Sequence, residues 1–339
     1  MKKRYKALLA AMLTGALAAG CLAGCGKMDG TAGGKMKKVT LNEVAHSIFY
    51  APQYAAIELG YFEEEGIDLT LVNGAGADKV MTAMLAGDAD IGFMGSEASI
   101  YTYAQGAEDY AVNFAQLTQR AGNFLVARQP DPDFTWQKLK GSRVLGGRAG
   151  GMPQMVFEYI LKKNGIDPKT DLTMDQSIQF GLTAAAFTSD QSDYTVEFEP
   201  FATGLELEGN GYVVASLGTD SGYVPYTAYC AKKSYMEKNP QLIQKFTNAI
   251  QKGLDYVNSH SAWEIAKTIQ PQFKDTPVEK IAAIIDRYKS QDTWKEDTIF
   301  EKDSFELLEN ILEESGELKK RVPYEDLVRT DFSINAAKK

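Results

Sequence analysis

Short apolar runs alternate with segments of helical periodicity along the first third of the chain. Three strand-like runs at residues 38–44, 67–72 and 89–94 are each followed by a predicted helix. Pro52 suits the first turn of the first helix, and Ser96 suits the N-cap of the third. Further strands are expected at residues 111–117 and 123–128. The repeated order of strand and helix predicts a mainly parallel sheet with helices on both faces.

A turn-rich break at residues 129–133 separates this half from a second series with the same alternation. A strand near residues 226–231 is expected to return the chain to the first half, and the remainder is helical. Capping-box patterns occur at residues 276–279 and 303–306. The pattern predicts an α/β protein of two three-layer lobes joined by two crossover strands, with lobe 1 at 38–127, lobe 2 at 128–229 and a return to lobe 1 with C-terminal helices at 230–339.

The N-terminal residues have the pattern of a bacterial export signal. Residues 1–6 carry four positive charges, and residues 7–19 form an apolar stretch that is too short to span a bilayer stably. The sequence Leu-Ala-Gly-Cys at 22–25 resembles a lipobox, so we expect a lipoprotein signal peptide at 1–24 and lipidation of Cys25. Cys21 is a weaker cleavage candidate, and an ordinary secretory signal is the alternative. The glycine-rich residues 25–37 are expected to be a flexible tether.

Charge and cysteine content narrow the class of protein. The 339 residues carry a formal net charge of −9, which disfavours a nucleic-acid surface because phosphate binding needs clustered Lys and Arg. The length predicts two domains. Of three cysteines only Cys230 lies in the folded part, so we expect neither a disulfide nor a zinc site, and we interpret Cys230 as a small core residue on a strand.

Catalytic candidates are scarce. The two histidines, His46 and His260, stand in no metal-ligand spacing and beside no nucleophile motif. We interpret His260 as a solvated residue at a helix C-terminus. His46 ends the first strand at the carboxyl edge, where ligands gather in open α/β sheets, and both a structural and a ligand-binding role are open for it. We expect no catalytic residue, no metal and no cofactor.

A glycine-rich segment at residues 146–153 lies between a predicted strand and a predicted helix. It lacks the Lys-Ser/Thr pair of a Walker loop and the spacing of a dinucleotide fingerprint. A tight turn that needs small residues is one interpretation. We favour a ligand loop, whose glycines permit close backbone approach and whose Arg148 is expected either to gate the cleft or to pair across it.

Aromatic and acidic side chains recur at the predicted carboxyl ends of strands. The aromatic residues suggest a slot for a flat ring, and they are Phe49, Tyr50, Phe180, Phe198, Phe201, Tyr223 and Tyr226. Glu197 and Glu199 are expected on the same strand face, and the sequence leaves open which of them enters the cleft. A carboxylate there would accept hydrogen bonds from N–H groups and repel a sulfonate or phosphate.

Residues 46–56, HSIFYAPQYAA, followed by residues 60–69, GYFEEEGIDL, resemble the opening of ABC-transporter substrate-binding proteins of the nitrate/sulfonate/taurine and thiamine-pyrimidine type. Residues 81–92 and the Glu199-Pro200 step agree with this resemblance. It implies a type II periplasmic-binding-protein fold that closes like a hinge around a small solute and delivers it to permease subunits in the membrane. We therefore expect a non-enzymatic, monomeric protein that is lipid-anchored on the extracellular face of the cytoplasmic membrane and binds no nucleic acid.

Within this family the Glu199-Pro200 step and the aromatic slot are similar to the branch that binds thiamine pyrimidine precursors. The ligand contacts that the resemblance implies are His46, Phe49, Tyr50, Asn73, Ser96, Gln116, Gly150, Phe180, Glu199 and Tyr223. Riboflavin, taurine, another sulfonate or nitrate are alternative ligands, and a sensory lipoprotein is an alternative role. The superfamily also includes a fungal enzyme that makes the thiamine pyrimidine from its own histidine and pyridoxal phosphate, but this chain lacks that enzyme's cysteine cluster and carries an export signal.

Overall fold

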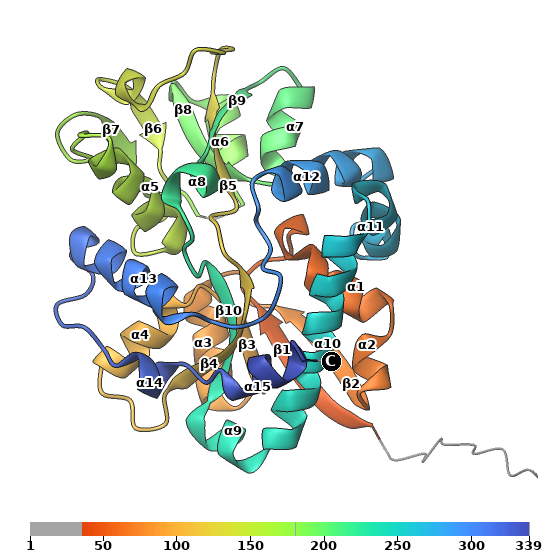
Figure 1. Ribbon diagram of the computed structural model, residues 1–339. Coiled ribbons are helices and arrows are strands. Elements are labelled where there is room, and N and C mark those ends of the chain that lie inside the picture. The colour runs from red at the N-terminus through yellow and green to blue at the C-terminus, as the bar shows by residue number, and fades with distance from the viewer. Residues whose placement is uncertain (1–35, 180, 339) are drawn as a thin grey trace, which may run out of the picture. The chain divides into compact units, whose positions relative to one another are not determined.

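The structure is a computed structural model that describes residues 36–179 and 181–338. Figure 1 shows two five-stranded sheets, one above the other, with helices packed around each. We call each sheet with its covering helices a lobe: the first lobe contains the sheet formed by β1 to β4 and β10, and the second lobe contains the sheet formed by β5 to β9. The predicted signal peptide, the lipidation site Cys25 and nearly all of the predicted tether lie outside the described residues.

The first sheet has the strand order β2-β1-β3-β10-β4. Its strands are β1 (Lys37–Glu43), β2 (Ile67–Asn73), β3 (Ile91–Met94), β4 (Ala111–Thr118) and β10 (Thr227–Lys232). β1 pairs in parallel with β2 and β3, whereas β10 runs antiparallel to both β3 and β4. The prediction of a mainly parallel sheet holds for the direction of β1 to β4 and fails for β10, because β10 returns from the other lobe in the opposite direction.

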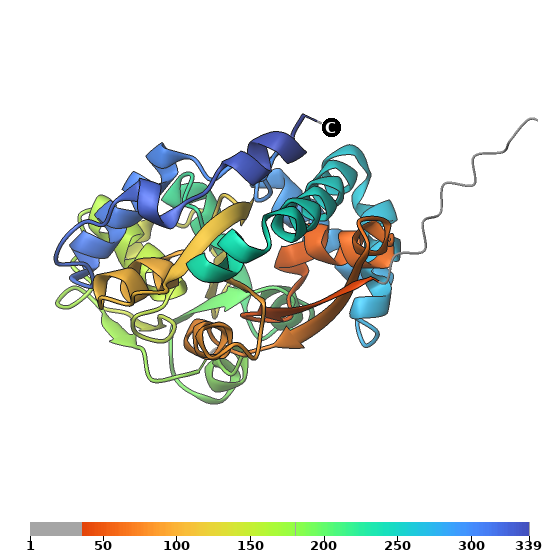
Figure 2. The ribbon, with the colours of Figure 1, turned by 90° about the horizontal axis from the view of Figure 1, so that it is seen from below.

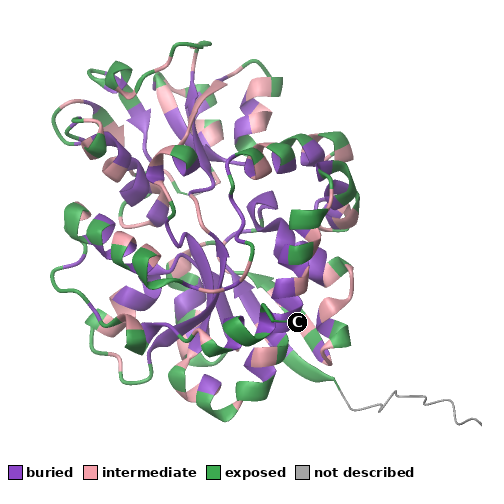
Figure 3. Cartoon of the chain, in the orientation of Figure 1, coloured by how far each residue is buried: buried purple, intermediate pink, exposed green. Residues whose placement is uncertain are grey.

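Burial differs among the strands of the first sheet. β3 and β4 are buried at every position, which matches their continuous apolar character. β3 is the central strand, whereas β4 is an edge strand that helices cover. β2 forms an edge and is exposed or half-buried at all positions after Ile67. Figure 3 shows the same contrast between the buried strands and the exposed edge.

The second sheet has the order β7-β6-β8-β5-β9, again part parallel and part antiparallel. Its strands are β5 (Asn123–Ala127), β6 (Arg143–Leu145), β7 (Thr173–Asp175), β8 (Tyr194–Phe198) and β9 (Tyr212–Ser216). Its helices are α5 (Met152–Lys163), α6 (Thr183–Ser189), α7 (Phe201–Leu207), α8 (Leu217–Ser221) and the 3-10 turn η2 (Trp136–Leu139).

Two crossings join the sheets. The sequence places the first crossing at the break after residue 127, but β5 pairs within the second sheet, so the chain has crossed by residue 123. The returning strand expected near residues 226–231 is β10, which belongs to the first sheet from Thr227. The chain therefore crosses back between β9 and β10, before the boundary of lobe 2 expected at residue 229. The crossings therefore occupy residues 119–122 and 217–226.

The remaining helices cover the first sheet and reach the second lobe. They are η1 (Ile48–Tyr50), α1 (Ala51–Glu58), α2 (Tyr61–Glu64), α3 (Ala77–Ala86), α4 (Glu97–Ala104), α9 (Lys233–Lys238), α10 (Pro240–Ser259), α11 (Ala262–Ile269), η3 (Gln270–Gln272), α12 (Val278–Ser290), α13 (Lys302–Ser315), α14 (Tyr324–Leu327) and α15 (Asp331–Ala336). α10 packs on α1, where Gly253 lets the helix approach the carbonyl of Pro52 closely. α10 and α15 both contact β4 (Figure 2). α13 packs against α5 of the second lobe.

Helix starts differ from the predicted capping boxes. Pro277 is the extended residue before α12, and α13 begins at Lys302, so neither predicted box is formed. The box that forms is at α11, where Ser261 and Glu264 exchange side-chain and backbone hydrogen bonds. Ser96 does occupy the N-cap position of α4, but its hydroxyl donates to the carbonyl of Pro225 instead of capping the helix.

The prediction for Cys230 is confirmed. It is a buried residue of β10 and the one cysteine of the described part of the chain, and it packs in a small apolar cluster with Val80 and Met84. Burial raises the pKa of its thiol to about 12, which keeps the thiol protonated and unreactive. His260 caps the end of α10 and stacks on Tyr256, which agrees with its interpretation as a helix-end residue.

Candidate functional site

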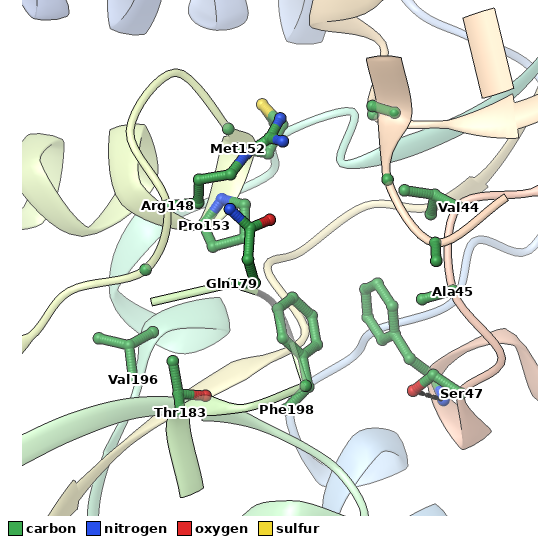
Figure 4. A pocket seen from close by; sticks show the side chains of 18 of the residues that line it. Val44, Ala45, Ser47, Arg148, Met152, Pro153, Gln179, Thr183, Val196 and Phe198 are labelled. Atoms are coloured by element: carbon green, nitrogen blue, oxygen red, sulfur yellow. Dashed lines mark hydrogen bonds between the residues drawn. The ribbon is translucent and has the colours of Figure 1, made fainter. Parts of the chain in front are cut away.

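A cavity of about 130 Å³ lies between the two lobes. Its wall combines the carboxyl ends of first-sheet strands with the strand ends and loops of the second sheet. Figure 4 shows Val44, Ala45 and Ser47 of the first lobe facing Arg148 and Phe198 of the second across the open space. One ordered water needs about 10–15 Å³, so the cavity has room for a small single-ring molecule.

Four buried aromatic rings from three segments form one side of the cavity. Phe49 and Tyr50 come from η1, Phe198 ends β8, and Tyr226 belongs to the return crossing. The centroid of the Phe49 ring lies 5.2 Å from Tyr50, 5.7 Å from Tyr226 and 5.9 Å from Phe198. Phe201, which is 38% exposed, adds a fifth ring at the rim. This arrangement offers apolar ring faces and edges to a flat guest.

Contacts from three parts of the chain fix the position of Phe49. The Ser47 hydroxyl accepts a hydrogen bond from the Phe49 N–H at 3.3 Å and starts η1. The indole N–H of Trp294 donates to the Phe49 carbonyl at 2.8 Å. Gly122 of the first crossing leaves room for the ring, because a Cβ atom there would lie 2.5 Å from ring carbons of Phe49.

Two buried carboxyl groups line the cavity from opposite lobes. Glu97 opens α4 in the first lobe and is 4% exposed, and Glu197 lies in β8 of the second lobe and is 1% exposed. Burial raises the pKa of each carboxyl to about 7. The two Glu197 oxygens accept hydrogen bonds from the hydroxyls of Thr195 and Thr183, at 2.7 and 2.9 Å, and these oppose the shift.

Glu199 lies outside the lining of the cavity, so Glu197 is the member of the predicted pair that faces it. The peptide bond between Glu199 and Pro200 is cis. The Glu199 carboxylate accepts hydrogen bonds from the Thr203 N–H and hydroxyl, and Arg287 of α12 pairs with it at 2.6 Å. Its carbonyl accepts the Ser47 hydroxyl of the first lobe at 3.0 Å. Its contacts thus join β8 to α12 and to the other lobe.

The glycine-rich loop reaches the cavity, as the preferred interpretation of the sequence has it. Gly147 and Gly151 line the wall, while Gly150 lies beside it and donates its N–H to Gln154. Gly147 and Gly150 have φ values of 84° and 79°, which favour glycine. Arg148 lines the cavity and lies 3.4 Å from Asp78 of α3, so it pairs across the lobes.

His46 belongs to a polar network behind the cavity and does not line it. Its Nδ1 lies 2.8 Å from the buried Glu43 carboxylate and its Nε2 lies 2.9 Å from the Gln272 carbonyl. The hydrogen bond to Glu43 raises the pKa of His46, because the protonated ring donates to both oxygens. Gln53 and Tyr54 complete the network by donating to the other Glu43 oxygen.

The remaining predicted contacts lie around the cavity without lining it. Asn73 accepts the N–H of Ala75, which does line the cavity, and Ser96 stands between the lining residues Gly95 and Glu97. Gln116 is buried in β4 and donates to the Thr118 carbonyl. Tyr223 is half exposed and donates to Asp292. Phe180 lies outside the described residues.

Sequence reasoning missed Glu97, although it follows the carboxyl end of a buried strand by three residues. That position is the available signal, since ligands gather at this edge. Met152 also lines the cavity and belongs to the glycine-rich segment that the sequence marks as a ligand loop. Thr183 and Gln179 line the cavity too, and neither was expected from the sequence.

Metal and membrane features are absent from the described residues. Within residues 36–179 and 181–338, no three His, Cys, Asp or Glu side chains gather so that they could hold a metal ion. In the same ranges no helix is long and apolar enough to cross a membrane.

Two mixed sheets, two crossings and a cavity between them define a type II periplasmic-binding fold, which solved structures share. The Escherichia coli aliphatic sulphonate binding protein SsuA matches with a TM-score of 0.69 at 17% identity, over 89% of this chain and 99% of that one. The nitrate-binding protein NrtA of Synechocystis PCC 6803 matches with a TM-score of 0.73 at 16% identity, over 90% and 89%.

The family follows from sequence comparison. A family model described as NMT1/THI5 like matches residues 47–262, and the chain belongs to this family. "Putative binding protein YtlA" of Bacillus subtilis (strain 168) is 47% identical over 298 residues, which cover 88% of this chain and 89% of that protein. The 4-amino-5-hydroxymethyl-2-methylpyrimidine phosphate synthase THI11 of Saccharomyces cerevisiae is 23% identical over 67% of this chain and 69% of that enzyme.

Proposed function

We propose that this protein is the solute-binding component of an ABC importer and that it closes around a small flat heterocycle of the thiamine-pyrimidine type. The observation that carries the proposal is the cavity between the lobes, in which four aromatic rings lie beside two buried carboxyl groups. The rings suit a planar guest, and carboxyl groups suit amino and ring N–H groups. The protein would release the guest without altering it chemically.

The relatives support the same guest class. The B. subtilis relative carries a binding-protein name, and the yeast relative is named for a phosphate of an aminopyrimidine. A ring of that size agrees with the volume of the cavity. In this role the protein would be monomeric, anchored outside the cell through Cys25, and would deliver its guest to permease subunits.

Contacts between the lobes suit hinge closure. The Ser47 hydroxyl donates to the Glu199 carbonyl, and Arg148 pairs with Asp78 at the cavity wall. Each contact joins a residue of the first lobe to a residue of the second lobe. A guest that touches both lobes would favour the closed state by its differential affinity.

An anion is the second candidate guest. Arg148 and the N-terminus of α5 both reach the cavity, and each favours negative charge. The Glu97 and Glu197 carboxyl groups line the same space, however, and Arg148 already faces Asp78. Binding an anion would place like charges together in a buried site, which disfavours nitrate and sulfonates.

A synthase activity has less support. The fungal enzymes of the superfamily use their own histidine, whereas neither histidine of this chain lines the cavity. His46 is occupied by Glu43 and Gln272, and His260 caps α10. We expect the mass of the protein to stay unchanged after incubation with pyridoxal phosphate.

Calorimetry with a ligand panel tests the proposal. The panel contains 4-amino-5-hydroxymethyl-2-methylpyrimidine, thiamine, riboflavin, taurine and nitrate. We expect a dissociation constant in the micromolar range or below for the pyrimidine and no heat from taurine or nitrate. Tight binding of taurine or nitrate without binding of any heterocycle would refute the proposed guest class.

A further inference from the structure

Glu97 carries an unsatisfied acceptor in the wall of the cavity. Its side chain is 4% exposed, and no hydrogen-bond partner is present for its Oε2 among the described residues. A buried polar atom left without a partner costs about 1–3 kcal/mol, and more when it is charged. An acceptor kept in such a state points to a donor that arrives from the cavity.

The second carboxyl group of the cavity provides the contrast. Both Glu197 oxygens already accept hydroxyl hydrogen bonds, from Thr195 and Thr183. Of the two carboxyl groups that line the cavity, Glu97 is therefore the one with an open acceptor position.

Nothing cationic in the described part of the chain is placed to neutralise Glu97. Backbone N–H groups of Glu97 itself and of Met152, at the start of α5, act on its carboxylate, but burial outweighs them. Arg148 is the one Lys or Arg among the residues that line the cavity, and it pairs with Asp78. Among the described residues, the Glu97 atom left without a partner is Oε2, and an N–H or cationic group of the guest would supply its hydrogen bond.

We infer that Glu97 determines the specificity of the cavity by accepting a hydrogen bond from an N–H group of the guest. The guest class is then a heterocycle with an exocyclic amino group or a ring N–H, and anions are rejected. This inference rests on the proposed function, because it places the guest in the same cavity. It also makes Glu97 a first-lobe anchor beside the aromatic rings of the cavity.

Gly95 provides a way to move the carboxylate without removing its charge. A Cβ atom on Gly95 would collide with the Glu97 carboxylate, and the backbone of Gly95 lies outside the left-handed region, so alanine is not strained there. Gly95→Ala therefore displaces the acceptor, whereas Glu97→Gln keeps its shape and removes its charge.

The test is calorimetry of 4-amino-5-hydroxymethyl-2-methylpyrimidine and taurine with the full chain and three variants. We expect Glu97→Gln and Gly95→Ala each to weaken pyrimidine binding at least tenfold. Glu309→Gln is the matched control: Glu309 is 3% exposed in α13, outside the cavity lining, and accepts the Val322 N–H. This control should bind the pyrimidine as the unmodified chain does.

Thermal unfolding separates recognition from support of the fold. Because burial disfavours the charged form of Glu97, the neutral amide of Glu97→Gln should leave the melting temperature of the free protein equal or raise it. A melting temperature that falls together with affinity would mark Glu97 as structural and overturn the inference.

The outcomes distinguish the inference from the proposed function. Pyrimidine binding by the unmodified chain that stays the same in folded Glu97→Gln and Gly95→Ala would overturn the inference alone. Failure of the unmodified chain to bind any N–H-bearing heterocycle of the panel would overturn the proposed function. Tighter binding of taurine than of the pyrimidine by the unmodified chain would overturn both.

Discussion

At the scale of residues, three buried glutamates in or near the cavity wall make different contacts. Glu197 faces the cavity with both oxygens satisfied, Glu97 faces it with one oxygen open, and Glu199 turns away to Arg287. The alternation of a strand places Glu197 and Glu199 on one face, but β8 ends at Phe198, so this rule no longer applies to Glu199.

Glu199 is expected to act on stability. It is fully buried beside a partly buried Arg287, so Glu199→Gln would leave the guanidinium with a neutral partner. Breaking a buried pair costs roughly 3 kcal/mol. We expect urea denaturation to show a loss of this order in the free energy of unfolding.

The second partner of Arg287 is the control for this prediction. Glu206 pairs with Arg287 at 2.7 Å but is 29% exposed. We expect Glu206→Gln to cost about 1 kcal/mol or less, because water screens such pairs. Equal losses for both variants would contradict the assigned difference in burial.

Site residues were predictable where a strand pattern and an aromatic type coincided. Phe49 and Tyr50 line the cavity and were expected from the sequence. Tyr223 satisfied the same rule but points to Asp292, because the direction of a side chain in a crossing depends on distant partners. The Oε2 atom of Glu97 has no partner because no neighbouring group in the described part of the fold donates a hydrogen bond to it. The order of residues along the chain does not show which groups become its neighbours.

At the scale of elements, local patterns predicted where strands and helices occur but not how strands pair. The predicted run at residues 123–128 became β5, yet its partners are β8 and β9 rather than its neighbour β4. The periodicity of a strand shows which of its faces is apolar. It does not show which sheet the strand joins, because both sheets bury apolar strand faces.

The capping box at the start of α11 leads to a prediction about the stability of the protein. Ser261 accepts the Glu264 N–H, while Glu264 accepts the Ser261 N–H. We expect Ser261→Ala to lower the free energy of unfolding by about 1 kcal/mol, since it removes an N-cap acceptor. Chemical denaturation monitored by circular dichroism would measure it.

Asp303 is the matched comparison, because the sequence pattern marks it as a cap and the structure places it inside α13. Asp303→Ala should cost only about 0.3–1 kcal/mol, the value of an acidic group in a first helical turn. A larger loss than that of Ser261→Ala would favour the sequence pattern over the structure.

At the scale of the whole molecule, the end of α12 binds the first crossing and the strand that leads into the second. The Tyr288 hydroxyl donates to the Gly122 carbonyl in the first crossing and contacts the Glu199 N–H. Gln291 donates to the Ala121 carbonyl and accepts from Ser216 at the end of β9. The C-terminal part of the chain thus meets the cavity wall at the point where the lobes join.

Gly122→Ala tests this junction. The added methyl group would meet the ring of Phe49, which touches Tyr288, Tyr226 and Phe198. Overpacking of this kind costs about 1–3 kcal/mol, so we expect lower stability in urea and weaker guest binding by calorimetry.

Gly204 supplies the control for the glycine substitution. It lies within α7, where a Cβ atom would make only an ordinary contact with Lys280. Gly204→Ala should therefore raise stability by about 0.4–1 kcal/mol and leave binding unchanged. If Gly122→Ala behaves in the same way, the ring of Phe49 is not held as described.

The late arrival of β10 has a consequence for biosynthesis. The second sheet takes all its strands from the unbroken stretch 123–216, whereas β3 and β4 stay without their shared neighbour until residues 227–232 have been made. Strands that are buried throughout and have unpaired edges invite association between nascent chains. A ribosome that is two thirds of the way along this message therefore carries one lobe able to complete its sheet and one whose β3 and β4 still await the strand that joins them.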